Sequence, residues 1–236
     1  MIPKIEQPLF NVKQPSNGKQ LKLRPMLVKE EKILLIAKSS EDENDINTAV
    51  KQVVNNCVLT EGFSINDITI FDLEYIFIKL RSQSVGNIVD VSYIDNDDDQ
   101  TRDFKIDLNT LEVTFPENNN NKITEGDITI IMKYPPCKLY DDRDLAEKDN
   151  IVDGIEHIIL NSIDKIYLKD EVYESKTISF EELKEFLDSM PISLYNKCRD
   201  YLDDLPFISH EIKYTNNMGN ERTITLRNLN DFFTLR

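Results

Sequence analysis

Residues 69–108, TIFDLEYIFIKLRSQSVGNIVDVSYIDNDDDQTRDFKIDL, contain the change of pattern that decides the fold class. The first part repeats apolar residues at helical spacing: Phe71, Leu73, Ile76, Phe77 and Leu80. After Gly86 the pattern changes to strand-like alternation on either side of the polar segment 95–100. The stretch therefore predicts a helix followed by an antiparallel β-hairpin, and an α+β fold for the whole chain.

The N-terminal side of this stretch predicts a short strand and two more helices. Residues 1–19 look extended without a defined element, and residues 21–24 alternate as a strand does. One helix is expected from about Leu27, and a second follows the cap at 40–43.

The C-terminal side predicts more sheet and then a second domain. Val113 and Phe115 are expected to extend the hairpin sheet, and residues 128–132 form a further strand. We place a domain boundary at Pro135–Pro136, because paired prolines interrupt regular structure. Residues 1–135 are then a helical domain with a hairpin sheet.

Residues 136–236 are expected to form a smaller α+β domain. Helices are predicted over 149–165, from the capping box that starts at Ser179, and over 194–202, with short strands near 165–168 and 172–173. A second hairpin follows, with strands at 207–214 and 222–226 and a turn at 216–220, and the chain ends in a helical tail at 228–233.

The two hairpins resemble each other. Both end in Ile-x-Leu-x-x-Leu, at residues 106–111 and 224–229, and each follows an amphipathic helix. We interpret them as a repeated helix-plus-hairpin unit, one in each half of the chain. The alternative is that two hairpins with the same alternation look alike without duplication.

Charge and cysteine content limit the classes of partner. The 236 residues carry 43 acidic and 28 basic side chains, a formal net charge of −15, and Lys and Arg are scattered beside Asp and Glu. Such a field repels phosphate backbones, so we expect no nucleic-acid partner.

No apolar run approaches the roughly 18 residues that a membrane span needs, and the N-terminus lacks the apolar core of a signal peptide. The odd, widely spaced Cys57, Cys137 and Cys198 favour buried thiols in a reducing cytoplasm.

The search for metal ligands finds no convincing site. His157 and His210 are far apart and neither hairpin turn contains a cysteine, which argues against zinc. Asp95, Asp97 and Asp99 match the first three ligand positions of a calcium loop, but the glycine and the bidentate glutamate of such a loop are missing. A solvated turn is the favoured interpretation, with calcium binding as an alternative.

Catalytic motifs are equally absent. There is no Gly-rich phosphate loop, and His157, flanked by isoleucines, is expected to be a packed or rim histidine rather than a base. We therefore predict no catalytic residue and no cofactor. The alternative from a different class is an unrecognised metal-dependent hydrolase.

Several segments, taken in order, resemble one protein family. They are 23–35 (LRPMLVKEEKILL), 56–58 (NCV), 71–86 (FDLEYIFIKLRSQSVG), 132–135 (MKYP) and 226–233 (LRNLNDFF). In order and spacing the chain is similar to the baseplate hub assembly proteins of T4-type myoviruses, especially those of cyanophages. The resemblance is nearly continuous to Pro135 and thinner beyond it.

The resemblance implies a role in building the central hub of a contractile-tail baseplate. Other hub or tail proteins would be the partners, in the host cytoplasm during infection and in the virion tail baseplate. A transient assembly chaperone that leaves before the particle matures is the alternative. Members of the family often carry Cys-x-x-Cys at hairpin tips, where this chain has 95–99 and 216–220, so no metal is carried over.

The candidate partner-binding residues lie in two places. Residues 27–36 form the most aliphatic predicted helix, and with Arg24, Lys29 and Lys32 they either complete the N-terminal core or dock a partner. The core interpretation is favoured, because apolar residues at helical spacing usually face inward. The hairpin tips are the second place, and their candidate residues are Asp97, Asp98 and Met218.

Overall fold

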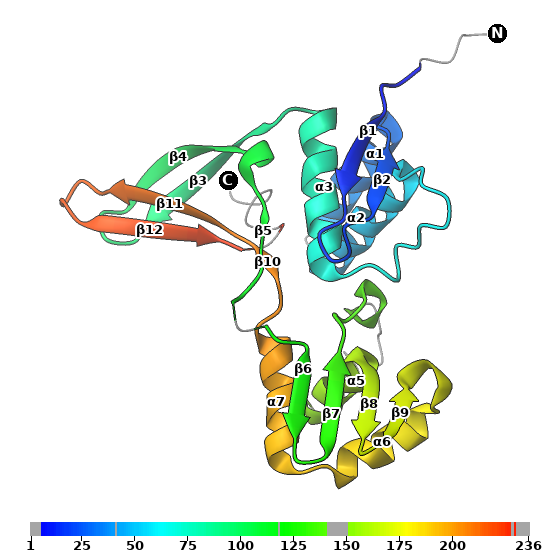
Figure 1. Ribbon diagram of the computed structural model, residues 1–236. Coiled ribbons are helices and arrows are strands. Elements are labelled where there is room, and N and C mark those ends of the chain that lie inside the picture. Colours follow the sequence, from blue (N-terminus) through cyan, green and yellow to red (C-terminus); the bar gives the residue numbers. More distant parts are fainter. Residues whose placement is uncertain (1–5, 41, 118, 141–150, 228, 230–236) are drawn as a thin grey trace. The chain divides into compact units, whose positions relative to one another are not determined.

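The computed structural model describes residues 6–40, 42–117, 119–140, 151–227 and 229 (Figure 1). The chain is a mixture of helices and small antiparallel sheets, which confirms the predicted α+β class. It divides into two compact units, and the second is inserted into the first. Unit 1 comprises Met1–Thr114 and Phe207–Arg236, and unit 2 comprises Phe115–Pro206.

This division differs from the boundary that we expected at Pro135–Pro136. Strands on either side of those prolines pair with each other in unit 2, because Ile130 lies opposite Ile166 in one sheet. The last hairpin returns to unit 1, where Phe207 pairs with Thr114. The prolines therefore lie in a connection between two strands of one unit. A boundary at these prolines, with domains 1–135 and 136–236, would separate paired strands in two sheets.

The helical part of unit 1 contains three helices and one hairpin: α1 (Val28–Ser40), α2 (Glu43–Cys57), α3 (Ile70–Ser84), β1 (Phe10–Lys13) and β2 (Gln20–Leu23). Asp42 caps α2, and Thr69 and Asp72 form a capping box on α3. The five apolar residues predicted for α3 are all buried, together with most of the apolar face of α2. The strand β1 was not predicted, because only Val12 in it is both apolar and buried.

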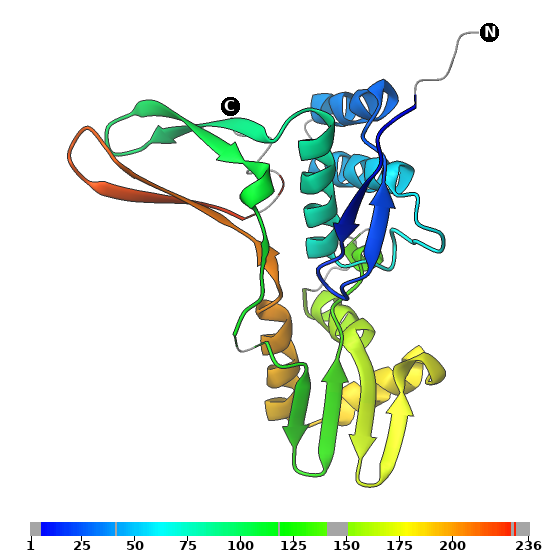
Figure 2. The same cartoon turned by 45° about the horizontal axis from the view of Figure 1, so that its top comes forward.

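The second part of unit 1 consists of two hairpins that pack on each other, β3 (Ile88–Asp95) with β4 (Gln100–Asp107) and β11 (His210–Thr215) with β12 (Glu221–Leu226). We call these four strands the hairpin arm (Figures 1 and 2). At its base, Ile106, Leu108 and Leu226 form a buried cluster with Ile78 of α3. The short turn η1 (Leu108–Thr110) and the pair β5 (Val113–Thr114) and β10 (Phe207–Ile208) complete this unit.

Unit 2 is a four-stranded antiparallel sheet with helices on one face (Figure 2). Its elements are β6 (Lys122–Glu125), β7 (Ile128–Met132), η2 (Cys137–Tyr140), α5 (Ile151–Ser162), β8 (Ile163–Leu168), β9 (Glu171–Glu174), η3 (Ser175–Thr177), α6 (Phe180–Ser189) and α7 (Ile192–Asp203). Ile130, Ile159 and Leu194, from a strand and two helices, are fully buried in its core. The predicted capping box of Ser179 and Glu182 opens α6.

Other expectations for the sheets were wrong in detail. Val113 pairs with Ile208 rather than with the first hairpin, and the Phe115 side chain is 50% exposed. Both hairpins, one from each half of the chain, lie in unit 1, and their origin as a repeated unit stays a prediction. The helical tail predicted over 228–233 falls almost entirely outside the described residues. No helix in the described part of the chain is both long and apolar enough to cross a bilayer.

Candidate partner-binding surfaces

The orientation of α1 is set by one buried ion pair. Glu30 is fully buried, and Arg24 donates to its carboxylate at 2.9 and 3.3 Å. The Leu27 amide donates to the same carboxylate at 2.9 Å. Burial alone would raise the pKa of Glu30, but the hydrogen bonds from Arg24 and Leu27 hold this pKa below its usual range. Glu30 therefore stays charged and faces the interior.

Arg24 also ties α1 to the end of α2. Its guanidinium donates to the carbonyl oxygen of Asn56 at 2.9 Å and lies 3.5 Å from the buried Cys57 sulfur. A cation is favourable at the carbonyl end of a helix, so this position supports the ion pair. Only 15% of the Arg24 side chain is exposed. The structure thus gives Arg24 a place inside unit 1, where it positions α1.

Three aliphatic residues of α1 face outward, whereas Ile33 and Leu34 are half-buried, so this segment only partly fits the core interpretation that we favoured. Val28 is 73% exposed, Leu35 56% and Ile36 72%, whereas Glu30 and Ala37 are the buried residues of the helix. Positions i, i+7 and i+8 fall on one helical face, so these three side chains form a single stripe. We call this stripe, with Lys29 and Lys32, the α1 face.

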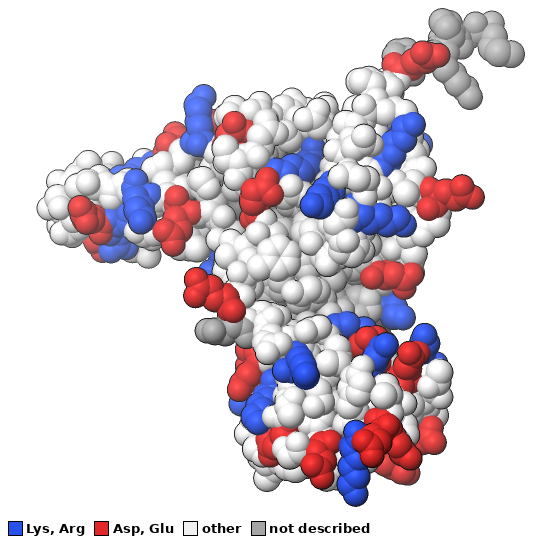
Figure 3. All heavy atoms as spheres, in the orientation of Figure 1, with Lys and Arg blue, Asp and Glu red and all other residues white. Residues whose placement is uncertain are grey.

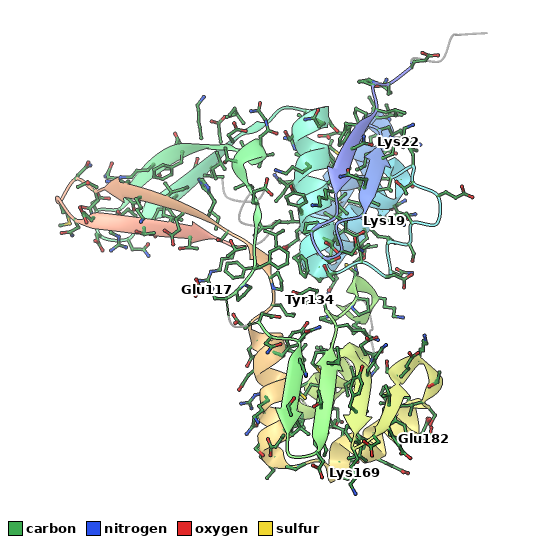
Figure 4. All side chains as sticks on the ribbon, in the orientation of Figure 1. Lys19, Lys22, Glu117, Tyr134, Lys169 and Glu182 are labelled. Carbon is green, nitrogen blue, oxygen red and sulfur yellow. The ribbon has the colours of Figure 1, made fainter. Side chains whose placement is uncertain are left out.

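The α1 face is basic on an acidic molecule. Lys29, Lys32 and Lys38 are exposed on α1 and outnumber Glu31, the exposed acid beside the apolar stripe. Residues 1–40 contain eight Lys and Arg against three Asp and Glu, whereas residues 41–236 contain 20 against 40. Lys19 and Lys22 on the neighbouring β1–β2 hairpin, labelled in Figure 4, are also exposed, and Figure 3 shows blue atoms over this part of unit 1. Our description of the basic residues as scattered was therefore wrong for this segment.

The interior of the hairpin arm changes from apolar to charged along its length. Inward positions near the base are aliphatic, and Val91 and Ile106 are buried. Further out, the rings of Phe104 and Tyr214 lie 5.4 Å apart, and the Arg102 guanidinium lies 5.2 Å from the Tyr214 ring. Hydrophobic burial therefore holds the base of the arm, and polar contacts hold its outer part.

The two tips of the arm are joined by carboxylates of the first hairpin. Tyr214 donates to Asp95 at 2.6 Å, and the Asn217 amide donates to Asp98 at 3.1 Å. Arg102 binds Asp98 with two nitrogens, at 2.9 and 2.5 Å. The hydrogen bond from Arg102 holds the pKa of Asp98 well below its usual range, and the one from Tyr214 lowers the pKa of Asp95. These acids remain ionised at neutral pH.

Asp97 makes a second bridge between the tips. Arg222 donates to its carboxylate at 2.9 Å, and Asn216 and Asn220 donate at 3.3 and 3.4 Å. Asp95 is fully buried, so the tip is a packed contact and not the solvated turn that we expected. Arg102 and Arg222 thus lie against Asp95 and Asp97, two of the three carboxylates that had suggested a calcium loop.

The predicted tip residues therefore separate into two kinds. Asp97 and Asp98 face the opposite hairpin, while Met218 is 66% exposed at the end of the second turn. On the outer surface of the arm, Ile94 is 60% exposed. The polar contacts of the acids hold the tip together, and Met218 is the predicted tip residue left for an external contact.

The histidine and cysteine candidates lie in packed surroundings. The His157 ring packs against Phe180 with centroids 5.5 Å apart, as a rim histidine does. Burial raises the pKa of the Cys57 and Cys198 thiols to about 11, so both are protonated at neutral pH. In the described residues, no group of three or more His, Cys, Asp or Glu side chains could hold a metal ion.

Unit 2 contains an open cavity of about 390 Å³ between β8, β9 and α6. Its lining is mainly apolar and includes Ile166, Tyr173 and Phe186. The single carboxylate in the lining is that of Glu182, labelled in Figure 4, and it accepts hydrogen bonds from Ser179 at the start of α6. This carboxylate therefore serves as a helix cap.

Comparison with known families gives the decisive result for identity. A family model described as T4 bacteriophage base plate protein matches residues 7–234. The chain belongs to the T4 bacteriophage base plate protein family. No curated protein and no solved structure matches this baseplate protein. Family membership implies contacts with other phage baseplate proteins, and the exposed α1 face is a surface of unit 1 suited to such a contact.

Proposed function

We propose that this baseplate protein acts in the assembly or structure of the central hub of the tail baseplate, by protein–protein contact and without catalysis. The observation that carries the proposal is the family match over residues 7–234. The motif at 23–35, which resembles hub assembly proteins, gives the reason for choosing the hub within the baseplate. The protein would be made in the host cytoplasm and act at the virion tail.

Two surfaces support a contact function. The α1 face exposes three aliphatic side chains beside two lysines on one helix. The end of the hairpin arm exposes Met218 on a tip whose charged residues are already paired. Exposed apolar groups on a rigid support are typical of protein interfaces. Among the predicted site residues, Lys29, Lys32 and Met218 would touch partners, and Arg24, Asp97 and Asp98 would position the two surfaces.

Loss of the gene during infection tests the proposal. Electron microscopy of cells infected with a phage that lacks this gene should show filled heads without complete tails, and the wild-type gene supplied in trans should restore tails. A complementing gene with Ile192→Ser on α7, at a side chain 79% exposed in unit 2, serves as a control for surface substitution and should also restore them. Normal, infectious tails without the protein would refute the proposal.

The transient chaperone remains the alternative function. A chaperone would use the same contact surfaces, but it would leave before the particle is complete. Quantitative mass spectrometry of purified particles separates the two, because a hub component is retained at a fixed ratio to other tail proteins and a chaperone is found in the lysate alone.

A further inference from the structure

We infer that the α1 face is a docking site for an acidic, amphipathic helical segment of another protein. The inference deepens the proposed hub function and rests on it for the biological setting. It is carried by the outward orientation of Val28, Leu35 and Ile36 and by the lysines beside them.

The exposure of this stripe is built into the fold. To turn Leu35 and Ile36 inward, α1 would have to rotate about its axis and withdraw Glu30 from Arg24 and from the Leu27 amide. A buried carboxylate without its partners is far more costly than an exposed aliphatic side chain. The ion pair thus fixes the apolar stripe on the outside of the unit, so that it is available to a partner.

The shape of the surface suits a helix. The 13 residues of α1 extend over about 20 Å at 1.5 Å per residue, and the stripe covers positions i, i+7 and i+8 along it. A second helix with apolar residues at i, i+3 or i+4, and i+7 matches this spacing by ridge-into-groove packing.

The charge of the surface indicates an acidic partner. Lys29 is 66% exposed at its side chain, and its amine lies 3.5 Å from the Glu30 carboxylate. Lys32 lies between Val28 and Leu35 on the same face, together with the exposed Glu31. Carboxylates that flank an apolar stripe on the partner would meet these amines at the rim of the contact, where charge sets specificity and association rate. Residues 1–40 carry a net charge of +5 within a chain of −15, so the attraction is local to this part of the molecule.

The same residues disfavour other occupants. A nucleic-acid backbone would use the lysines but not three exposed aliphatic side chains. A two-fold contact between the α1 faces of two copies would bring the lysines of both copies into one interface with only Glu31 of each copy to oppose them. The acidic helical segment is therefore the occupant that uses both the apolar and the basic groups.

Site-specific photo-crosslinking in infected cells tests the inference. A benzophenone amino acid placed at Ile36 should capture one peptide of another protein that is net acidic and has apolar residues at helical spacing. The matched control places the same amino acid at Ile94, which is 60% exposed on the hairpin arm, and this site should not capture that peptide. Capture from Ile36 of a second copy of this chain, a basic peptide, nucleic acid or lipid, or capture of nothing, would overturn the inference.

Charge reversal provides a quantitative second test. A synthetic peptide of the captured sequence should bind Lys29→Glu/Lys32→Glu at least about tenfold more weakly than the unmodified protein. The control is Lys105→Glu/Lys213→Glu on the arm, where both side chains are more than 70% exposed, and it should leave the affinity unchanged. Equal weakening by both pairs would contradict a specific role for the α1 face.

The results distinguish failure of the inference from failure of the proposed function. If particles contain the protein but Ile36 captures no acidic segment, the hub proposal survives and the docking inference fails. If Ile36 captures an acidic helix of a protein unrelated to tails, the docking inference survives and the hub proposal fails.

Discussion

At the scale of single residues, Arg24 and Glu30 determine which way the N-terminal helix faces. Helical periodicity favoured burial of the aliphatic residues of 27–36, but Val28, Leu35 and Ile36 are exposed, because the buried Glu30 carboxylate occupies an inward position of the helix. Local apolar spacing carries no information about an ionic partner such as Arg24, which lies six residues before Glu30 and just after β2. The excess of lysine within residues 1–40 was the available signal for an exposed face.

Glu30→Gln should lower the free energy of unfolding by about 2–3 kcal/mol, because the substitution leaves the Arg24 guanidinium at the end of α2 without its counterion. This loss of stability is smaller than the roughly 3–5 kcal/mol expected for breaking a fully buried ion pair, because 15% of the Arg24 side chain reaches solvent. Urea denaturation measures it. Lys32→Gln on the exposed face is the control and should change stability by less than about 0.5 kcal/mol. Equal stability of Glu30→Gln and the unmodified protein would show that the pair does not hold the helix.

The contribution of Glu30 should also depend on pH. Its pKa is lowered in the folded protein, so its stabilisation is present above the unfolded value of about 4.3 and is lost as pH falls through the folded value. The stability difference between the unmodified protein and Glu30→Gln should therefore shrink as the pH is lowered from about 4.3 towards about 2. A difference that stays constant over this range would contradict the charged state assigned to Glu30.

At the scale of elements, the sequence predicted most helices and both long hairpins, since these segments have strong periodicity and recognisable caps. The short strands β1 and β6 were missed, because four residues with one buried apolar side chain each give almost no pattern. The contact between the two hairpin tips was not predicted either. It joins Asp95 to Tyr214 across more than one hundred residues of sequence, and hairpin patterns are local.

The polar tip contact should hold the two hairpins together. Asp98→Asn removes the bidentate pairing with Arg102 and weakens the bond from the Asn217 amide, so hydrogen exchange of the second turn should accelerate by about tenfold. Asp90→Asn, whose carboxylate is 72% exposed on the outside of the arm, is the matched control. Unchanged exchange in the 215–221 segment of Asp98→Asn would mean that the tips do not depend on this carboxylate.

At the scale of the whole molecule, the order of elements along the chain does not match their grouping in space. The predicted boundary at Pro135–Pro136 followed local composition, while the actual units are defined by pairing between distant strands such as β5 and β10. Such pairing depends on long-range contacts that a single sequence does not display. The family resemblance was visible from ordered motifs, and the family match covers residues 7–234.

The insertion of unit 2 makes a prediction about fragments. A chain of residues 115–206 contains the complete four-stranded sheet and its three helices, so it should fold cooperatively alone, as circular dichroism and thermal unfolding would show. A chain of residues 136–236 lacks β6 and β7 and should show no cooperative transition. The reverse result, with 136–236 folded and 115–206 unfolded, would contradict the division into units.

We propose that this member of the T4 base plate family is retained in the tail hub rather than acting only as a transient assembly factor. Quantitative mass spectrometry of purified particles, with the infected-cell lysate as the positive control, tests that claim most directly. We predict that the protein is present in particles at a fixed stoichiometric ratio to other baseplate proteins. Abundance in the lysate together with absence from the particles would contradict the account and assign the protein to transient assembly instead.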